Sequence, residues 1–204
     1  NHRALFEAAG FPVENYPYYD AATRGVNFAG MKAKLDALQP GSIVVLHACC
    51  HNPTGADLSD AQWDEVVAVC RERGLVPFLD MAYQGFADGI EPDAVAVRAF
   101  AASGLQFLVS SSFSKSFSLY GERVGALSII TASKDESARV LPQLKRVIRT
   151  NYSNPPTHGG AIVAAVLNSA ELRQMWEDEL GGMRERIRAM RTGLVDQLRA
   201  EGVA

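Results

Sequence analysis

Short apolar runs and helical apolar spacings alternate along the chain. Residues 43–46 (Ile-Val-Val-Leu) form a β-branched run between turn residues, which is typical of a strand buried on both faces. Residues 75–79, 105–109 and 124–130 predict three further strands. Pro77 argues against a central place for the strand at 75–79, because proline cannot donate to a neighbouring strand. The segment before residue 124 is too short for a helical crossover, so the last strand is predicted to run antiparallel to its neighbour.

Helical spacing fills the segments between and after these strands. Ser59 and Gln62 form a capping box at the start of one helix, and Gly74 stands where a helix-ending glycine belongs. The last helix, residues 171–199, carries one apolar stripe. It is longer than most globular helices, which is typical of a connection between two domains. Gly181-Gly182 in its middle is a plausible bend. The other predicted helices cover residues 3–9, a short part of 27–38, 93–102, 134–149 and 158–168, and a short extended run covers 13–16.

This alternation of strands and helices predicts an α/β fold with a mostly parallel sheet and flanking helices. Residues 1–168 make up this unit, and residues 169–204 are the long helix that follows it. The chain begins with Asn1 rather than Met and ends just past a helical pattern. We therefore expect it to be a fragment of a longer polypeptide.

Composition narrows the classes of function. The 204 residues are 48% hydrophobic and 21% charged with a net charge of −3, as in ordinary globular proteins. No basic stripe predicts a nucleic-acid partner, and no apolar run approaches the ~18 residues of a membrane helix. The three cysteines Cys49, Cys50 and Cys70 are an odd number with two adjacent, which favours reduced thiols in the cytoplasm over disulfides.

Three polar residues follow the first three predicted strands. Asn52, Asp80 and Lys115 are 28 and 35 residues apart, and each interval fits one strand–helix–strand unit. Ligands of such sheets bind outside the carboxyl ends of the strands, so all three residues are predicted to meet at one edge. Each alone has a simpler interpretation: Asn52 starts a turn, Asp80 caps the next segment, and Lys115 is a solvated surface lysine. An amide, a carboxylate and a lysine together favour a site.

Two other groups suggest metal or redox chemistry less strongly. His47 and His51 have the four-residue spacing of a helical metal pair, but they lie at a strand end with no acidic residue between them. Cys49 and Cys50 have no second cysteine pair of the kind that zinc sites use. We therefore expect these residues to pack or to support neighbouring side chains, and we expect no metal ion.

The predicted edge suits pyridoxal phosphate. A lysine amine condenses with a carbonyl to form a Schiff base, and in pyridoxal phosphate enzymes a carboxylate sits at the pyridine nitrogen. A carboxylate such as that of Asp80, about 3 Å from the ring nitrogen, stabilises its protonated form by roughly 5 kcal/mol. Asn52 and Tyr83 offer donors for the ring's phenolic oxygen, which lowers the pKa of the Schiff base. The phosphate has three candidate partners: Ser112, Ser114 and Arg123.

At these residues the sequence resembles the aspartate/aromatic amino acid aminotransferases, which are fold-type-I pyridoxal phosphate enzymes. The resemblance runs in register over the whole chain but covers about half of a typical family member. Residues 55–58 (Gly-Ala-Asp-Leu) and 119–122 (Leu-Tyr-Gly-Glu) are closest to the bacterial aromatic (tyrosine) branch. The matching motifs are residues 47–55 (HACCHNPTG), 80–86 (DMAYQGF), 111–115 (SSFSK), 120–125 (YGERVG) and 149–156 (RTNYSNPP).

The resemblance implies transamination of an aromatic or dicarboxylic amino acid with a 2-oxo acid such as 2-oxoglutarate. It implies that Lys115 is the Schiff-base lysine that also moves the substrate proton, and that Asp80 is the partner of the pyridine nitrogen. Tyr83 and Asn52 would contact the ring oxygen, and Asn52 would also touch the substrate carboxylate. Arg149 would reach across a homodimer to a distal substrate carboxylate; otherwise it is a last-turn arginine facing the helix dipole. The phosphate ligands would be Ser112, Ser114 and Arg123.

The resemblance also bears on the domains. It implies that residues 1–168 are part of a cofactor-binding large domain and that residues 169–204 lead toward a small domain outside this chain. Segments that complete the site in the family are outside it too, so whether the fragment alone binds cofactor stays open. A non-catalytic scaffold domain of the same fold is the main alternative.

A more remote alternative is a Ser-Lys acyl enzyme. Ser112-Phe-Ser-Lys115 satisfies the S-x-x-K pattern, and Tyr152-Ser-Asn resembles a second element of penicillin-recognising enzymes. However, the chain contains no K-T-G, and S-x-x-K normally opens a helix rather than following a buried strand.

Overall fold

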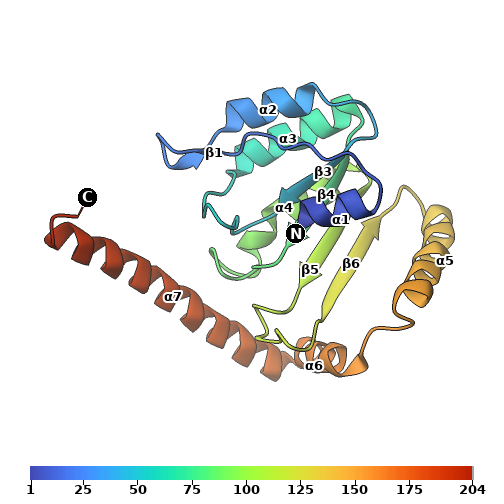
Figure 1. The fold of residues 1–204 in the computed structure, drawn as a ribbon. Helices are drawn as coiled ribbons and strands as arrows, with labels where there is room; N and C mark the ends of the chain where they lie inside the picture. Colours follow the sequence, from blue (N-terminus) through green and yellow to red (C-terminus); the bar gives the residue numbers. More distant parts are fainter. Residues whose placement is uncertain (204) are drawn as a thin grey trace.

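The computed structural model describes residues 1–203, which form a four-stranded sheet with helices around it (Figure 1). The strand order is β3-β4-β5-β6; the first three strands are parallel and β6 is antiparallel to β5. The prediction of a mostly parallel α/β sheet is confirmed. The strands are β3 (Ile43–His47), β4 (Val76–Met81), β5 (Phe107–Ser112) and β6 (Gly125–Ile130), and a separate antiparallel pair is formed by β1 (Tyr19–Asp20) and β2 (Gly25–Val26).

The predicted helices are present with end points shifted by a few residues. The Ser59–Gln62 capping box begins α3, and Gly74 ends it in the left-handed conformation at φ 62°. Residues 13–16 form no strand; the chain pairs only further on, at β1. The helices are α1 (His2–Ala8), α2 (Phe28–Asp36), α3 (Asp60–Arg73), the short 3₁₀ helix η1 (Pro92–Ala94), α4 (Val95–Ser103), α5 (Lys134–Asn151), α6 (Thr157–Leu167) and α7 (Ala170–Ala200).

One expectation about strand position is wrong. Pro77 lies in β4, which is a central strand between β3 and β5. The backbone N–H of Val76 donates to Ser42, toward β3, so the next residue, Pro77, faces β5. Pairing with β5 begins only at Phe78, opposite Leu108. The missing N–H of Pro77 therefore falls just before this ladder starts, where it removes no hydrogen bond.

The two faces of the sheet have different neighbours. Leu79 is fully buried in a core that β3, β4 and β5 share with α2, α3 and α4. Phe78 and Asp80 point to the other face, where they meet Phe6 and His2 of α1. One face therefore provides stability, and the other leaves a polar side chain accessible at the end of β4.

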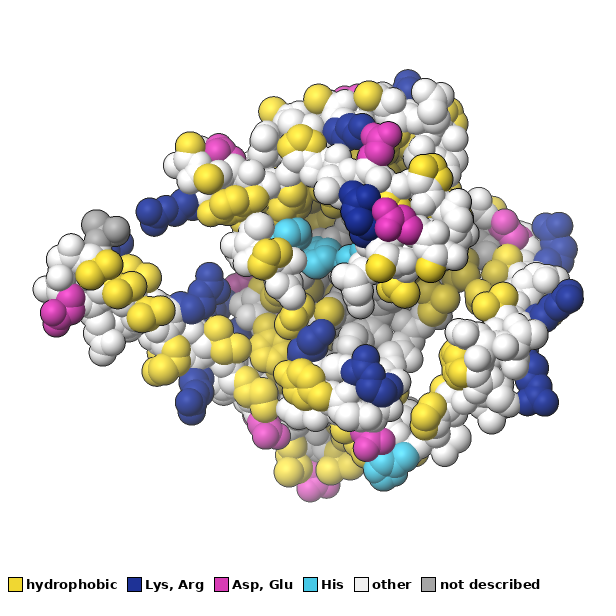
Figure 2. All heavy atoms as spheres, viewed as in Figure 1, with side chains coloured by type: hydrophobic (Ala, Val, Ile, Leu, Met, Phe, Trp, Pro, Cys, Tyr) yellow, Lys and Arg dark blue, Asp and Glu magenta, His cyan; other side chains and the backbone are white. Residues whose placement is uncertain are grey.

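The prediction of a long final helix is confirmed. α7 runs unbroken over 31 residues, through Gly181-Gly182, and its far half extends away from the sheet (Figure 1). Leu180 is buried, whereas Met190 is 61% exposed, and hydrophobic side chains are visible along this half (Figure 2). Among residues 1–203 no helix is both long and apolar enough to cross a membrane.

Candidate active site

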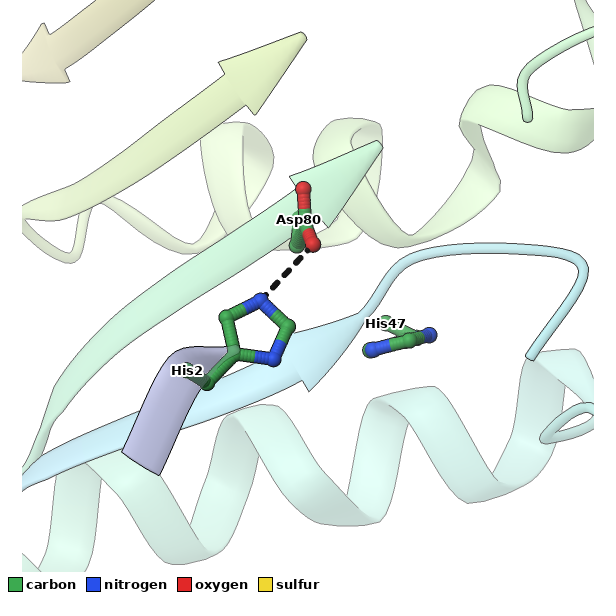
Figure 3. A group of neighbouring side chains, drawn as sticks. All are labelled: His2, His47 and Asp80. Atoms are coloured by element: carbon green, nitrogen blue, oxygen red, sulfur yellow. Dashed lines mark hydrogen bonds and ion pairs between the residues drawn. The ribbon is translucent and has the colours of Figure 1, made fainter. Parts of the chain in front are cut away.

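Asp80 lies at the centre of the predicted edge. In the register of the sheet it is opposite His47 of β3 on one side and Ser110 of β5 on the other. Its Oδ1 accepts a hydrogen bond from the Ser110 hydroxyl at 3.0 Å, and its Oδ2 lies 2.9 Å from Nε2 of His2 (Figure 3). A carboxylate only accepts, so Nε2 of His2 carries the hydrogen of this bond. The carboxylate is therefore fixed from two sides.

Histidines surround this carboxylate. The ring of His47 stands edge-on to that of His2, with centroids 5.6 Å apart, and Figure 3 shows both beside Asp80. Burial lowers the pKa of His47, and burial together with His47 lowers the pKa of His51. His51 in turn stacks on Tyr18 at 3.9 Å. These contacts agree with the packing role expected for His47 and His51.

A cation could approach three of these groups. His2, His47 and Asp80 each offer one ligand-type atom, and these atoms lie within 4.8 Å of one another. The hydrogen bond between His2 and Asp80 already satisfies two of the three groups, so we assign no metal to them.

Tyr83 connects two other predicted site residues. The Asn52 amide Nδ2 donates to the Tyr83 hydroxyl at 3.2 Å. The Lys115 Nζ stands over the Tyr83 ring, 4.6 Å from its centroid, at the distance of a cation–π contact. Asn52 follows β3, Tyr83 follows β4 and Lys115 follows β5. The loops at this edge therefore bring together side chains that are far apart in the sequence.

The candidate phosphate ligands lie at the end of β5 (Ser112), in the turn that follows it (Ser114) and in the turn before β6 (Arg123). Ser112 pairs with Gly125, and the N–H of Ser114 donates to the Ser112 hydroxyl at 3.3 Å. Ser114 is buried, whereas the Arg123 side chain is exposed and donates to the Tyr120 carbonyl at 2.9 Å. Arg123 has a positive φ of 51°, which an L-residue adopts only with local support. The backbone thus places these residues close together, with the guanidinium turned toward its own loop.

Arg149 stands apart from this edge. It is exposed in the last turn of α5, and its guanidinium donates to the Ser153 hydroxyl. In Figure 1, α5 lies beyond β6, on the side of the sheet opposite β3. Within this chain its contacts are those of a helix-end arginine, so any role at the site needs another contact.

The motif of the acyl-enzyme alternative does not open a helix. Ser112 is the last residue of β5, and Lys115 lies in the turn that follows. The Ser112 hydroxyl accepts from Ser114 N–H, while the Lys115 amine faces Tyr83.

The cysteines are free thiols. Cys49 and Cys70 are buried and Cys50 is partly buried. A hydrogen bond with Cys50 and burial raise the pKa of Cys49, and burial raises the pKa of Cys70 to about 12. Both thiols are therefore protonated at neutral pH.

The sequence analysis missed two residues of this site. His2 contacts Asp80 from a helix 78 residues away in the chain, and no local motif around it indicates this contact. Ser110 was within reach of prediction, because a parallel register that puts residue 80 opposite residue 110 follows from aligning the two strand ends.

The fold, a mostly parallel sheet with flanking helices and a long final helix, matches that of aminotransferases. Residues 1–204 match the family "Aminotransferase class I and II" throughout, so the chain belongs to this family. It is 71% identical to an aspartate aminotransferase from Pseudomonas aeruginosa over 202 residues, which are 99% of this chain and 51% of that protein. It is 55% identical to an aromatic-amino-acid aminotransferase from Escherichia coli, covering 98% of this chain and 51% of that protein.

A solved structure agrees. The aromatic-amino-acid aminotransferase from Burkholderia pseudomallei, crystallised covalently bound to pyridoxal phosphate, superposes with a TM-score of 0.97 at 74% identity. The match covers 99% of this chain and 51% of that one. The chain thus spans about half the length of the relatives that it matches.

Proposed function

We propose that this chain is the central part of a pyridoxal-phosphate-dependent aminotransferase. The observation that carries the proposal is the convergence of Lys115, Tyr83 and Asn52 at the edge where Asp80 lies, one residue before the end of β4. Members of the same family with similar sequence are named aspartate and aromatic-amino-acid aminotransferases, and one of them holds the cofactor covalently.

The side chains present fit this cofactor. An amine suits its carbonyl, an ionised carboxylate suits its ring nitrogen, and a phenol with an amide suits its ring oxygen. Asp80 keeps acceptor capacity beyond its bonds to His2 and Ser110, since a carboxylate accepts about four hydrogen bonds. The donor set therefore matches each polar group of the ring with a partner of the right type.

When bound, pyridoxal phosphate supplies a carbonyl that captures an amine and a ring that accepts electrons from the substrate carbon. Lys115 holds the cofactor and, once released, moves the proton at the substrate α-carbon. Asp80 keeps a proton on the ring nitrogen, and His2 and Ser110 fix the orientation of its carboxylate. The Tyr83 ring lies with its centroid 4.6 Å from the Lys115 nitrogen and would keep the released lysine beside the ring once it has taken up the proton.

The phosphate end is served by hydroxyls and one guanidinium. Ser112 at the end of β5 and Ser114 in the following turn offer two hydroxyls, and Arg123 precedes β6, two residues before the Gly125 that pairs with Ser112. Binding a dianion requires the guanidinium to turn from the Tyr120 carbonyl toward the serines. Arg123 thus adds charge-assisted hydrogen bonds where the hydroxyls alone give weak ones.

The substrates are proposed to be an aromatic or dicarboxylic amino acid and a 2-oxo acid such as 2-oxoglutarate. Arg149 is exposed and away from the edge of its own chain, which fits a role at the site of a second copy in a homodimer. Asn52 is exposed at the edge and can contact the substrate α-carboxylate. A forked guanidinium suits a distal carboxylate, and its alkyl stem and exposed surroundings tolerate an aromatic ring.

Arg149→Ala therefore separates the substrate classes. We expect kcat/KM for aspartate and glutamate to fall by about 10²-fold, because a charge-assisted contact worth roughly 3 kcal/mol is lost. Phenylalanine and tyrosine lose much less. Arg146→Ala, on the same exposed helix, is the control. Equal losses for both substrate classes would contradict the assignment of Arg149 to substrate recognition.

We further propose that residues 1–168 belong to the cofactor-binding large domain and that α7 leads into a small domain. The exposed apolar residues on the far half of α7 support this proposal. The free cysteines agree with a cytoplasmic location.

The test is to load the whole protein with pyridoxal phosphate, reduce it with borohydride and map the modified lysine by peptide mass. Label confined to Lys115 is expected. Lys115→Ala should lose both the label and turnover, whereas Lys145→Ala, at an exposed position on α5, should keep both. Label spread over several surface lysines, or a protein that stays colourless with added cofactor, would favour a non-catalytic scaffold.

A further inference from the structure

The loop after Tyr83, residues 85–89, is hydrogen-bonded to the buried carboxylate of Asp93. Asp93 of η1 is only 4% exposed, and each of its two oxygens accepts two backbone hydrogen bonds from this loop. The donors are the amides of Gly85 (2.7 Å), Ala87 (3.0 Å), Asp88 (2.8 Å) and Gly89 (3.3 Å). Four hydrogen bonds from backbone amides to this one side chain fix the shape of residues 85–89.

The same loop is held from the other side by α7. Arg184 Nη1 donates to the carbonyl of Gly85 at 2.9 Å, across 99 residues of sequence. One turn further along α7, Arg188 donates to the carbonyl of Ala87 and to the Asp88 carboxylate. The Arg184 side chain is mostly buried, and its Nε is enclosed, 3.6 Å from the Glu185 carboxylate. The Arg184 guanidinium thus contacts the loop and is largely shielded from solvent.

Packing leaves no gap between the loop and α7. Gly85 has a φ of 96°, and a Cβ built on it would stand 2.4 Å from Cδ2 of Leu180. Leu180 is itself buried. The carbonyl that Arg184 holds therefore belongs to a residue pressed directly against the helix, two positions after Tyr83.

Tyr83 transmits this placement to the site. Its hydroxyl accepts from Asn52, its ring lies under the Lys115 amine, and its carbonyl lies 3.5 Å from the Cys50 thiol. A shift of the loop backbone moves this hydroxyl relative to all three neighbours. The position of α7 and the position of the phenol are consequently linked through Gly85.

We propose that Arg184 is a positioning residue, which acts through the Gly85 carbonyl to set the Tyr83 hydroxyl against the cofactor ring. This inference rests on the proposed function. Arg184 does not touch the reacting groups; it fixes the backbone that carries one of them. Arg188 assists from the surface by holding the next part of the loop.

The test uses the whole protein loaded with pyridoxal phosphate and follows the cofactor's absorbance as pH is varied. A phenol that donates a hydrogen bond to the ring oxygen of the cofactor favours the deprotonated form of the nitrogen that links Lys115 to it. Displacing the phenol therefore raises the pH midpoint of the absorbance change. Arg184→Met is expected to raise this pH midpoint by about half a pH unit, which corresponds to weakening one hydrogen bond without losing it. Arg184→Lys, which can still donate to the carbonyl, should restore part of the shift. Arg186→Met, exposed on the same helix, should leave the midpoint unchanged.

A double-variant comparison separates positioning from general damage. In a Tyr83→Phe background the hydroxyl is absent, so Arg184→Met should cause no further shift. A shift that simply adds to that of Tyr83→Phe would overturn the proposal. Should Arg184→Met fail to fold, Arg188→Met removes the surface contacts to Ala87 and Asp88 instead, and a smaller shift of the same sign is expected.

A second readout needs no cofactor. Amide hydrogen exchange at residues 85–89 should be faster in Arg184→Met than in the parent, while exchange in α3 stays the same. A parent protein whose cofactor label misses Lys115 would overturn the proposed function and this inference together. A parent that labels normally, with an unshifted midpoint in folded Arg184→Met, would overturn this inference alone.

Discussion

The chain before the turn at residue 113 and the chain after it follow the same hydrophobic patterns but pack differently. In the first region the apolar residues of β3, β4 and β5 meet those of α2, α3 and α4 in one continuous core. In the second region, up to residue 203, the buried hydrophobic residues are Val163 and Leu180. A comparable apolar pattern thus leads to burial in one region and to exposure in the other.

Many exposed apolar residues of the second region lie on the helices α5 and α7. Val147 of α5 is 62% exposed, and Met190 and Leu194 of α7 are exposed as well. Their spacing matches that of helices packed on a core. An amphipathic pattern therefore predicts that a face will be covered, without specifying what covers it.

The two regions also differ in the chemistry they supply. Asp80, Tyr83 and Asn52 come from the first region, held by strand ends and by bonds to one another. Arg149 comes from the second and makes only a helix-end contact. The proposed partners of the cofactor ring thus come from the region with its own core, whereas Lys115 and the proposed distal substrate contact Arg149 come from the region that follows it.

Asp80→Asn tests the first region and should have the largest effect. Asparagine keeps the shape of the side chain but loses the charge that holds a proton on the ring nitrogen. We expect kcat to fall by about 10³-fold for every substrate, given the roughly 5 kcal/mol interaction of charges 3 Å apart. Steady-state kinetics of the whole protein with aspartate and with tyrosine measures the effect.

The control for Asp80→Asn is Asp64→Asn, at an exposed position on α3. It should leave kcat unchanged for both substrates. A loss with Asp80→Asn that is confined to one substrate class would mean that Asp80 recognises substrate rather than the cofactor ring.

Truncating one side chain in each region measures their difference in packing. Phe100 of α4 is fully buried, so Phe100→Ala should lower the free energy of unfolding of this chain by about 3–5 kcal/mol. Met190→Ala, at an exposed position, should change it by less than about 0.5 kcal/mol. Urea denaturation followed by circular dichroism gives both values.

The same Met190→Ala change in the whole protein sharpens the comparison. If a further domain covers α7, Met190→Ala should lower the free energy of unfolding of the whole protein by more than about 1 kcal/mol, a loss that the 204-residue chain does not show. No cost in either context would mean that this helix face stays open, and the proposed domain arrangement would be wrong.

Local signals explain how much of the fold the sequence predicts. The capping box at Ser59 and the β-branched run of β3 are short-range features, and both lie where expected. Pro77 misled because its effect depends on where the neighbouring strand begins to pair, which a single strand does not encode.

The site divides in the same way. Asn52, Asp80 and Lys115 were predictable because each lies at or just beyond the end of a strand, and parallel strands end at one edge. His2 was not, since its contact with Asp80 depends on how α1 docks on the sheet, 78 residues away. Arg149 shows the complementary limit: its contacts within the chain are local, so its proposed role depends on a second copy.

The smallest effect concerns the histidines at the site. Burial lowers the pKa of His47, so the unfolded chain takes up a proton near pH 6.5 while the folded chain resists it. The stability that the neutral ring contributes is therefore present above this pH and is lost as pH falls below it. His47→Gln removes the loss of stability that protonation of His47 causes at low pH. The lowered pKa of His51 keeps part of the dependence of stability on pH, and the Asp80 charge, which raises the pKa of His47, makes the effect of His47 smaller.

We expect the melting temperature of this chain to fall less steeply between pH 7.5 and about 5.5 in His47→Gln than in the parent. His158→Gln, at an exposed position in α6, should keep the parent's slope. An unchanged slope in His47→Gln would show that the ring protonates as easily in the folded chain as in the unfolded one. The role of burial in lowering the pKa of His47 beside Asp80 would then be wrong.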